Sequence, residues 1–205
     1  MYELPLLSFG DVLHTVNLSL VYQSKMSGNP YKIANGFGLN LQKRLISYQD
    51  TAYGYESGNG EYVELNRNED THVSIFSDGS QRIVRYVNNS FVLENPDYST
   101  EKYGIGDNIE STKDKYGNEI LRYSYNTNSS LNTIIYRPDV TNKKISFAYN
   151  DSGKLESISY LLGNQIICTT NLVYLENGGI KVQHYSGVDY YIIPTETSFT
   201  VYSRD

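Results

Sequence analysis

The chain has 205 residues, the size of one ordinary domain, and 39% of them are apolar, enough to build a core. Twenty-one tyrosines and only three alanines argue against an all-α fold or an ordinary α/β enzyme, because alanine favours helices whereas aromatic residues favour strands. A net charge of −6 lacks the basic footprint of a nucleic-acid binder, and no apolar run approaches the roughly 18 residues of a transmembrane helix.

The first 60 residues are predicted to be entry strands. Met1–Leu7 has no basic segment and too short an apolar run for a signal peptide. Residues 12–22 alternate as one long strand. After a loop at 24–36, a second strand is predicted from Gly36 through Ile46, and residues 53–60 are predicted to be a turn.

Residues 61–205 are predicted to form β-hairpins. In the clearest one, Ile145, Phe147 and Tyr149 alternate with small residues, and the sequence Asn-Asp-Ser-Gly at 150–153 is typical of a hairpin turn. On the return strand, Leu155 is expected on the face opposite Ile158. Similar turn clusters recur at 77–80, 95–97, 115–118 and 177–179. The pattern predicts one all-β domain over 1–205, a meandering and spiralling antiparallel sheet that forms an open or partial barrel or shell.

Two segments repeat at an offset of 24 residues. The matching pairs are Tyr123/Phe147, Tyr125/Tyr149, Asn126/Asn150, Leu131/Leu155 and Ile134/Ile158. Weaker copies place Tyr103 22 residues before Tyr125 and Tyr174 25 residues after Tyr149, so the repeat length is about 22–25. Because 24 is even, we expect Tyr125 and Tyr149 on one face of neighbouring hairpins. Leu131 and Leu155 should be buried.

These residues resemble a known repeat. Residues 149–158, Tyr-Asn-Asp-Ser-Gly-Lys-Leu-Glu-Ser-Ile, resemble the YD repeat of Rhs, wall-associated and teneurin-type proteins, with Asn150 in place of the family's Asp and Lys154 in place of its Arg. In the copy at Tyr125, Ser130 stands at the glycine position. Residues 115–118 resemble the stretch between such repeats. Residues 16–24 and 36–41 resemble the segment that precedes these arrays, without its Trp.

The resemblance implies hairpins wound side by side, which in long arrays close into a hollow shell. A chain of this length supplies only a few hairpins, so we expect a section of a longer polypeptide or a short version capped by residues 1–60. The implied function is that of a non-enzymatic structural module in a bacterial cell-surface or secreted protein. The implied partners are other repeats, a cargo domain, or a cell-surface glycan or protein.

Candidate catalytic and metal-binding residues are few. Cys168 and His184 are the one thiol–imidazole pair close in sequence, but Cys168 follows two isoleucines and fits a buried strand position. His14, His72 and His184 lack the short spacing of a metal site, and Asp70–His72 reads as a strand end. We therefore predict no catalytic residues, no metal and no cofactor.

The remaining candidates define two alternatives. Asp107 with Glu110, or Asp114 with Glu119, could serve as glycosidase carboxylates, although carboxylates in turns are normally solvated. The tyrosine pairs 53/55, 123/125 and 190/191 could form an aromatic platform. The principal alternative to a structural module is thus a carbohydrate- or ligand-binding β module with a tyrosine-lined face, and the third is a glycoside hydrolase.

Overall fold

The computed structural model describes residues 1–11, 14–23, 33–34, 36–58, 60–68, 71–75, 79–104, 107–195 and 199–204, with backbone only for 67–68 and 71–75. Within these ranges all the regular secondary structure is β-strand, in three antiparallel sheets. The predicted all-β class, with consecutive antiparallel hairpins, is confirmed.

The largest sheet has fourteen strands, and each pairs with the strand that follows it in the chain. Among the described residues its outer strands do not pair with each other, so the sheet stays open. In order, the strands are β7 (Asn66–Asn68), β8 (Thr71–Ile75), β9 (Gln81–Val87), β10 (Ser90–Glu94), β11 (Thr100–Tyr103), β12 (Ile109–Lys113), β13 (Glu119–Tyr125), β14 (Leu131–Tyr136), β15 (Lys143–Tyr149), β16 (Leu155–Leu162), β17 (Gln165–Tyr174), β18 (Ile180–Gln183), β19 (Asp189–Pro194) and β20 (Phe199–Arg204).

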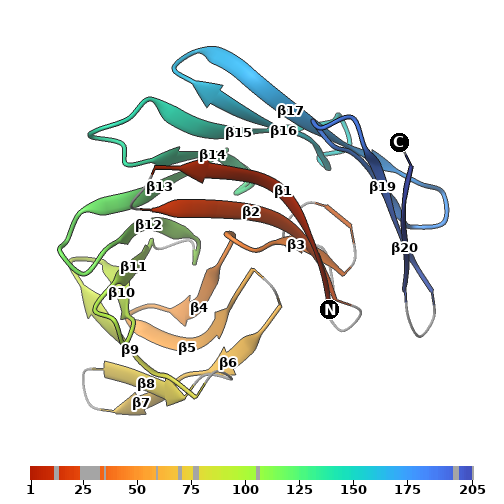
Figure 1. Ribbon diagram of the computed structural model, residues 1–205. Helices are drawn as coiled ribbons and strands as arrows, with labels where there is room; N and C mark the ends of the chain where they lie inside the picture. The colour runs from red at the N-terminus through yellow and green to blue at the C-terminus, as the bar shows by residue number, and fades with distance from the viewer. Residues whose placement is uncertain are drawn as a thin grey trace.

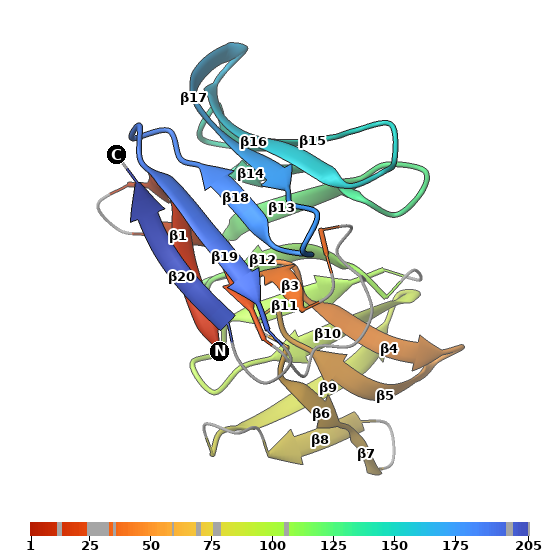
Figure 2. The same cartoon turned by 90° about the vertical axis from the view of Figure 1, so that its right-hand side faces the viewer.

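The two small sheets come from the first third of the chain. One contains β1 (Tyr2–Gly10), β2 (Thr15–Tyr22) and β3 (Phe37–Leu39), and the other contains β4 (Arg44–Tyr48), β5 (Thr51–Glu56) and β6 (Tyr62–Glu64). Figure 1 shows the large sheet curling around both of them, and Figure 2 shows the same arrangement from the side. The N-terminal hairpin β1–β2 therefore occupies the concave side of the curl.

The core lies between this hairpin and the large sheet. Leu6, Leu18 and Leu20 of the hairpin are fully buried. The ring of Phe9 lies 6.1 Å from that of Tyr136 and 6.2 Å from that of Tyr160. Apolar residues of both sheets form one cluster, so the hairpin fills the interior that a hollow shell would leave open.

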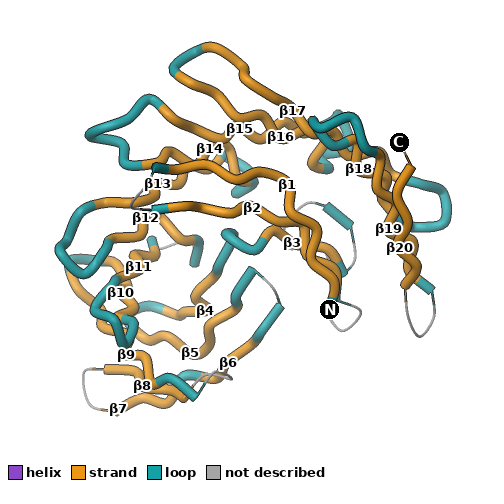
Figure 3. The backbone as a smooth tube through the Cα atoms, in the orientation of Figure 1, coloured by secondary structure: helices purple, strands orange, loops and turns teal. Residues whose placement is uncertain are grey.

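The predicted repeat is present as a repeated contact between consecutive strands, whose course along the backbone Figure 3 shows. Tyr125, Tyr149 and Tyr174 are each the last residue of a strand, and each side chain packs against the core. Their hydroxyl groups donate to the carbonyl of the first residue of the preceding strand, namely Ile109, Leu131 and Leu155 in turn. The predictions for the two tyrosines, and for the burial of Leu131 and Leu155, are confirmed.

The hairpin turns also share one geometry. In seven turns of the large sheet, as far as it is described, the first residue donates its N–H to the carbonyl four residues on and accepts the N–H three residues on. A type I turn followed by a residue with positive φ makes this pattern. The turns begin at Asn95, Gly104, Asp114, Asn126, Asn150, Leu175 and His184.

The structure corrects the face predicted for the return strand. Leu155 and Ile158 are both fully buried, although they are three residues apart. The register shifts where Tyr149 pairs with Leu155 and Ala148 pairs with Ser157. This leaves Glu156 as the extra residue of a β-bulge, which resets the alternation.

Two predictions for the first 60 residues are also wrong. The strand predicted from 36 to 46 is divided between β3 and β4, because the side chain of Asn40 accepts from Ser19 N and donates to Asn17 O where the ladder would continue. The turn predicted at 53–60 is wrong in its first half: residues 53–56 belong to β5, where Tyr55 is buried, and the turn begins only at Ser57.

Gly54 allows the Tyr62 ring to pack closely against β5, because a Cβ on Gly54 would lie 2.7 Å from that ring. The loop predicted at 24–36 and the turn at 77–80 lie mostly outside the described residues.

Candidate functional site

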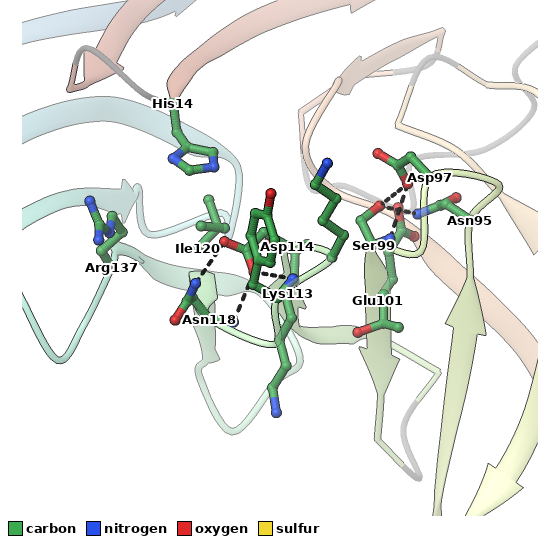
Figure 4. Close-up of a pocket in the computed structure, with 14 residues that line it drawn as sticks. His14, Asn95, Asp97, Ser99, Glu101, Lys113, Asp114, Asn118, Ile120 and Arg137 are labelled. Carbon is green, nitrogen blue, oxygen red and sulfur yellow. Dashed lines mark hydrogen bonds between the residues drawn. The ribbon is translucent and has the colours of Figure 1, made fainter.

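Among the described residues, one pocket lies where the N-terminal hairpin approaches two turns of the large sheet. Its volume is about 650 Å³. His14 reaches it from the N-terminal hairpin, Asp97 and Asp114 from the β10–β11 and β12–β13 turns, and Arg137 from the end of β14 (Figure 4). The pocket thus joins residues that are far apart in the sequence.

The two turn carboxylates are held by their own turns. Asp114 accepts from the backbone N–H groups of Tyr116 and Asn118 and from the side chain of Asn118, each at 2.9 Å. Asp97 accepts from Ser99 Oγ at 2.6 Å and from Ser99 N at 3.0 Å. These hydrogen bonds lower the pKa of both carboxyl groups, so both are ionised at neutral pH.

A set of contacts fixes the N-terminal hairpin at the pocket. Arg137 Nη1 lies 2.8 Å from Asp11 Oδ2, and His14 N donates to Asp11 Oδ1. The Tyr136 hydroxyl donates to the His14 carbonyl at 3.2 Å. Among the described residues the buried Nδ1 of His14 has no hydrogen-bond partner, so this lining residue carries an unsatisfied polar atom.

Glu101, another lining residue, is buried, with 5% of its surface exposed. One carboxylate oxygen forms an ion pair with Lys43, and the other accepts from the Tyr103 hydroxyl at 2.5 Å. Burial raises the pKa of Tyr103 and of its neighbour Tyr55 well above the usual value. No motif in the sequence singles out this cluster. The signal was a glutamate two residues from a buried tyrosine, on the same face of a short strand.

The structure does not assemble Cys168 and His184 into a nucleophile–base pair. Cys168 lies in β17 opposite Tyr160, and burial raises the pKa of its thiol. His184 begins the β18–β19 turn, where Nδ1 accepts from Ser186 N and lies 2.7 Å from Ser186 Oγ. Its Nε2 therefore carries the proton and donates to the Leu6 carbonyl at 3.1 Å, and burial lowers the pKa of the ring.

The glycosidase candidates are each bound by a neighbouring residue. Asp107 accepts from the backbone and hydroxyl of Ser47. Glu110 forms an ion pair with Lys102 at 2.7 Å, and Glu119 binds Arg122 through both carboxylate oxygens.

The metal candidates are not brought together either. No group of three His, Cys, Asp or Glu residues is arranged to hold a metal ion in the part of the chain that the structure describes. The side chain of His72 and all of Asp70 lie outside it.

The predicted tyrosine platforms are mostly interior. Tyr55 and Tyr123 are buried, so the 53/55 and 123/125 pairs form no exposed platform. The 190/191 pair is divided: Tyr190 packs against the core, and the half-buried Tyr191 stacks on the exposed Tyr202 with ring centres 4.7 Å apart and planes at 7°. The guanidinium of Arg204 lies within 5.6 Å of both ring centres.

The chain matches no known family model, and a search of curated proteins finds no relative of it. No helix long and apolar enough to cross a membrane occurs among the described residues.

Proposed function

We propose that the chain is a non-enzymatic structural module of the YD-repeat type, a section of β-wall in a bacterial cell-surface or secreted protein. In this proposal its hairpins present or anchor neighbouring parts of the same polypeptide. These parts are further repeats or a cargo domain, and a separate partner would be a glycan or protein of the cell surface.

The observation that supports this proposal is the repeated tyrosine contact. Tyr125, Tyr149 and Tyr174 make the same hydrogen bond to the preceding strand in three successive hairpins. A contact that recurs in successive hairpins helps a sheet to continue from one repeat to the next, whereas a catalytic site needs a group of residues that occurs once. The candidate glycosidase carboxylates are held by hydrogen bonds or ion pairs to other residues of the chain, which also favours a structural role.

The test is the natural polypeptide that carries this sequence. We expect protease treatment of intact cells to release peptides from residues 61–205, and mass spectrometry to find further Tyr-turn-Leu units beside them. Recovery of these residues only from the cytosol, as a protein without neighbouring repeats, would contradict the proposal. So would hydrolysis of a glycan substrate that the Asp114→Asn variant loses.

A ligand-binding module is the second candidate. The pocket lined by His14, whose buried Nδ1 has no hydrogen-bond partner among the described residues, favours it. Titration with neutral oligosaccharides, followed by tyrosine fluorescence, tests it. Binding that Tyr116→Ala abolishes would support it. Tyr98→Ala is the matched control, because Tyr98 is an exposed tyrosine of the adjacent turn outside the pocket lining.

A further inference from the structure

Exposed aliphatic side chains gather at the rim where the β14–β15 loop meets the turn of the β16–β17 hairpin. Val140 is 69% exposed, Leu162 50%, Ile166 60% and Ile167 50%. We call these four residues the apolar rim. The N–H of Gly163 in the hairpin turn donates to the carbonyl of Asn142 at 2.8 Å, which joins the two loops.

The hairpin carries this rim beyond the core. Ile158, Tyr160 and Leu162 alternate onto the inner face of β16. Ile158 is buried and the Tyr160 ring contacts Phe9, but Leu162 is half exposed because the N-terminal hairpin no longer covers it. Ile166 pairs with Leu161, which lies on the opposite face from Leu162, so apolar side chains are exposed on both faces of the tip. Figures 1 and 2 both show this hairpin as the uppermost extremity of the molecule.

The charge around the rim differs from that of the whole molecule. Residues 157–175 contain no charged side chain, although the chain carries a net charge of −6. Lys144 of β15 pairs with Leu161 and lies beside the apolar tip, whereas the ammonium group of Lys143, which pairs with Leu162, is turned to the N-terminal hairpin and donates to the Gly10 carbonyl. The loop at 138–142 contributes one acid, Asp139.

We propose that the apolar rim docks on a phospholipid surface, with its side chains in the interfacial layer and Lys144 near anionic headgroups. A surface element binds such an interface through a few apolar side chains combined with basic residues. A stable protein–protein interface needs roughly 20–30 residues from each partner, far more than this protruding tip offers.

The backbone sets the depth of insertion. β18 pairs with β17 only at residues 171–174, so the first six residues of β17 have no strand on their outer side. Unpaired backbone groups are strongly unfavourable in hydrocarbon, so the tip stays at headgroup level.

Vesicle flotation of the full chain tests this proposal. One set of vesicles is phosphatidylcholine alone, and in the other about a third of the lipid is phosphatidylglycerol. We expect binding to the anionic vesicles to fall at least about tenfold in the Ile166→Ser/Ile167→Ser variant, because two half-exposed aliphatic side chains no longer enter the interface. The Val173→Ser variant is the matched control, since Val173 is an exposed residue at the other end of β17. It should bind like the unmodified chain.

Several results would overturn the proposal. One is no flotation with either vesicle, and another is flotation that the double variant retains. Light scattering after size-exclusion chromatography provides the third: a dimer that the double variant loses would assign the rim to self-association instead. Unchanged circular dichroism and thermal unfolding of both variants would show that a loss of binding is not a loss of folding.

Discussion

A single hydroxyl group distinguishes the repeat tyrosines from ordinary core aromatics. Tyr149→Phe keeps the buried ring but removes the donor to the Leu131 carbonyl. We expect a loss of about 0.5–1.5 kcal/mol in the free energy of unfolding, the usual net value of such a hydrogen bond. Urea denaturation measures it, and Tyr116→Phe, at an exposed turn position, should be neutral. Equal effects of the two changes would argue against a linking role for the hydroxyl.

The same residue gives a pH prediction. Burial raises the pKa of Tyr149 from 10.0 to about 12, and the pKa values of Tyr174 and Tyr123 are also raised by burial. Below pH 10 the phenol is protonated in both folded and unfolded chains, so its full contribution to stability is present. As the pH rises from 10 towards 12, only the unfolded chain ionises, and stability falls. Unfolding followed against pH should show this decline, and it should be less steep in Tyr149→Phe.

Because the hairpin turns share one geometry, the residue with positive φ can be compared between two of them. The structure places Ser129, not the predicted Ser130, at the glycine position of the Tyr125 copy: Gly153 (φ 75°) and Ser129 (φ 63°) occupy the same position in their turns. A left-handed backbone costs an L-residue roughly 1–2 kcal/mol. Ser129→Gly should therefore raise the thermal midpoint, whereas Gly153→Ser should lower it. A Cβ at Gly153 meets no atom within 4 Å, so the loss reports backbone strain alone. If both changes shifted the midpoint in the same direction, the turns would not be equivalent.

The β4–β6 sheet is tied to the large sheet by the ion pair of Lys43 with Glu101. Glu101→Gln leaves Lys43 without its counter-charge, and breaking a buried pair from one side costs about 3–5 kcal/mol. Lys43 is a quarter exposed, which places the expected loss at the lower end of that range. The double change Lys43→Met/Glu101→Leu should restore much of the stability. Chemical denaturation of the three variants decides this, and a double variant as unstable as the single one would contradict it.

The sequence predicted the hairpins of the large sheet well because their determinants are local. The Tyr125 and Tyr149 units could be matched by a short alternation and a turn four or five residues long. The bulge at Glu156 could not, because it depends on register with β15. The division of β3 from β4 depends on side-chain bonds from Asn40 to a strand about 20 residues away.

The site was less predictable than the sheet. The pocket combines His14, Asp97 and Arg137, which meet only because the large sheet curls back over the N-terminal hairpin. No local pattern encodes that approach. The buried position of Glu101 was equally hidden, since its counter-ion, Lys43, lies 58 residues away.

At the scale of the whole molecule, one ring connects the N-terminal hairpin to the middle of the large sheet. Phe9→Ala removes the contacts with Tyr136 and Tyr160. We expect a loss of about 3–5 kcal/mol, as for other buried phenylalanines. Hydrogen exchange should show faster exchange in both β1–β2 and β14–β16. Faster exchange in the hairpin alone would mean that the large sheet keeps its curvature without the packing of the N-terminal hairpin.

The contacts of the N-terminal hairpin also determine when it can dock. Its partners stand far along the chain: 122 residues separate His14 from Tyr136, and 178 separate Leu6 from His184. At ordinary rates of synthesis, a ribosome needs on the order of 10–40 s to add the last of these residues. The first strands to be made are therefore among the last to find their place. During that interval their leucines are exposed, which makes the nascent chain a substrate for chaperones.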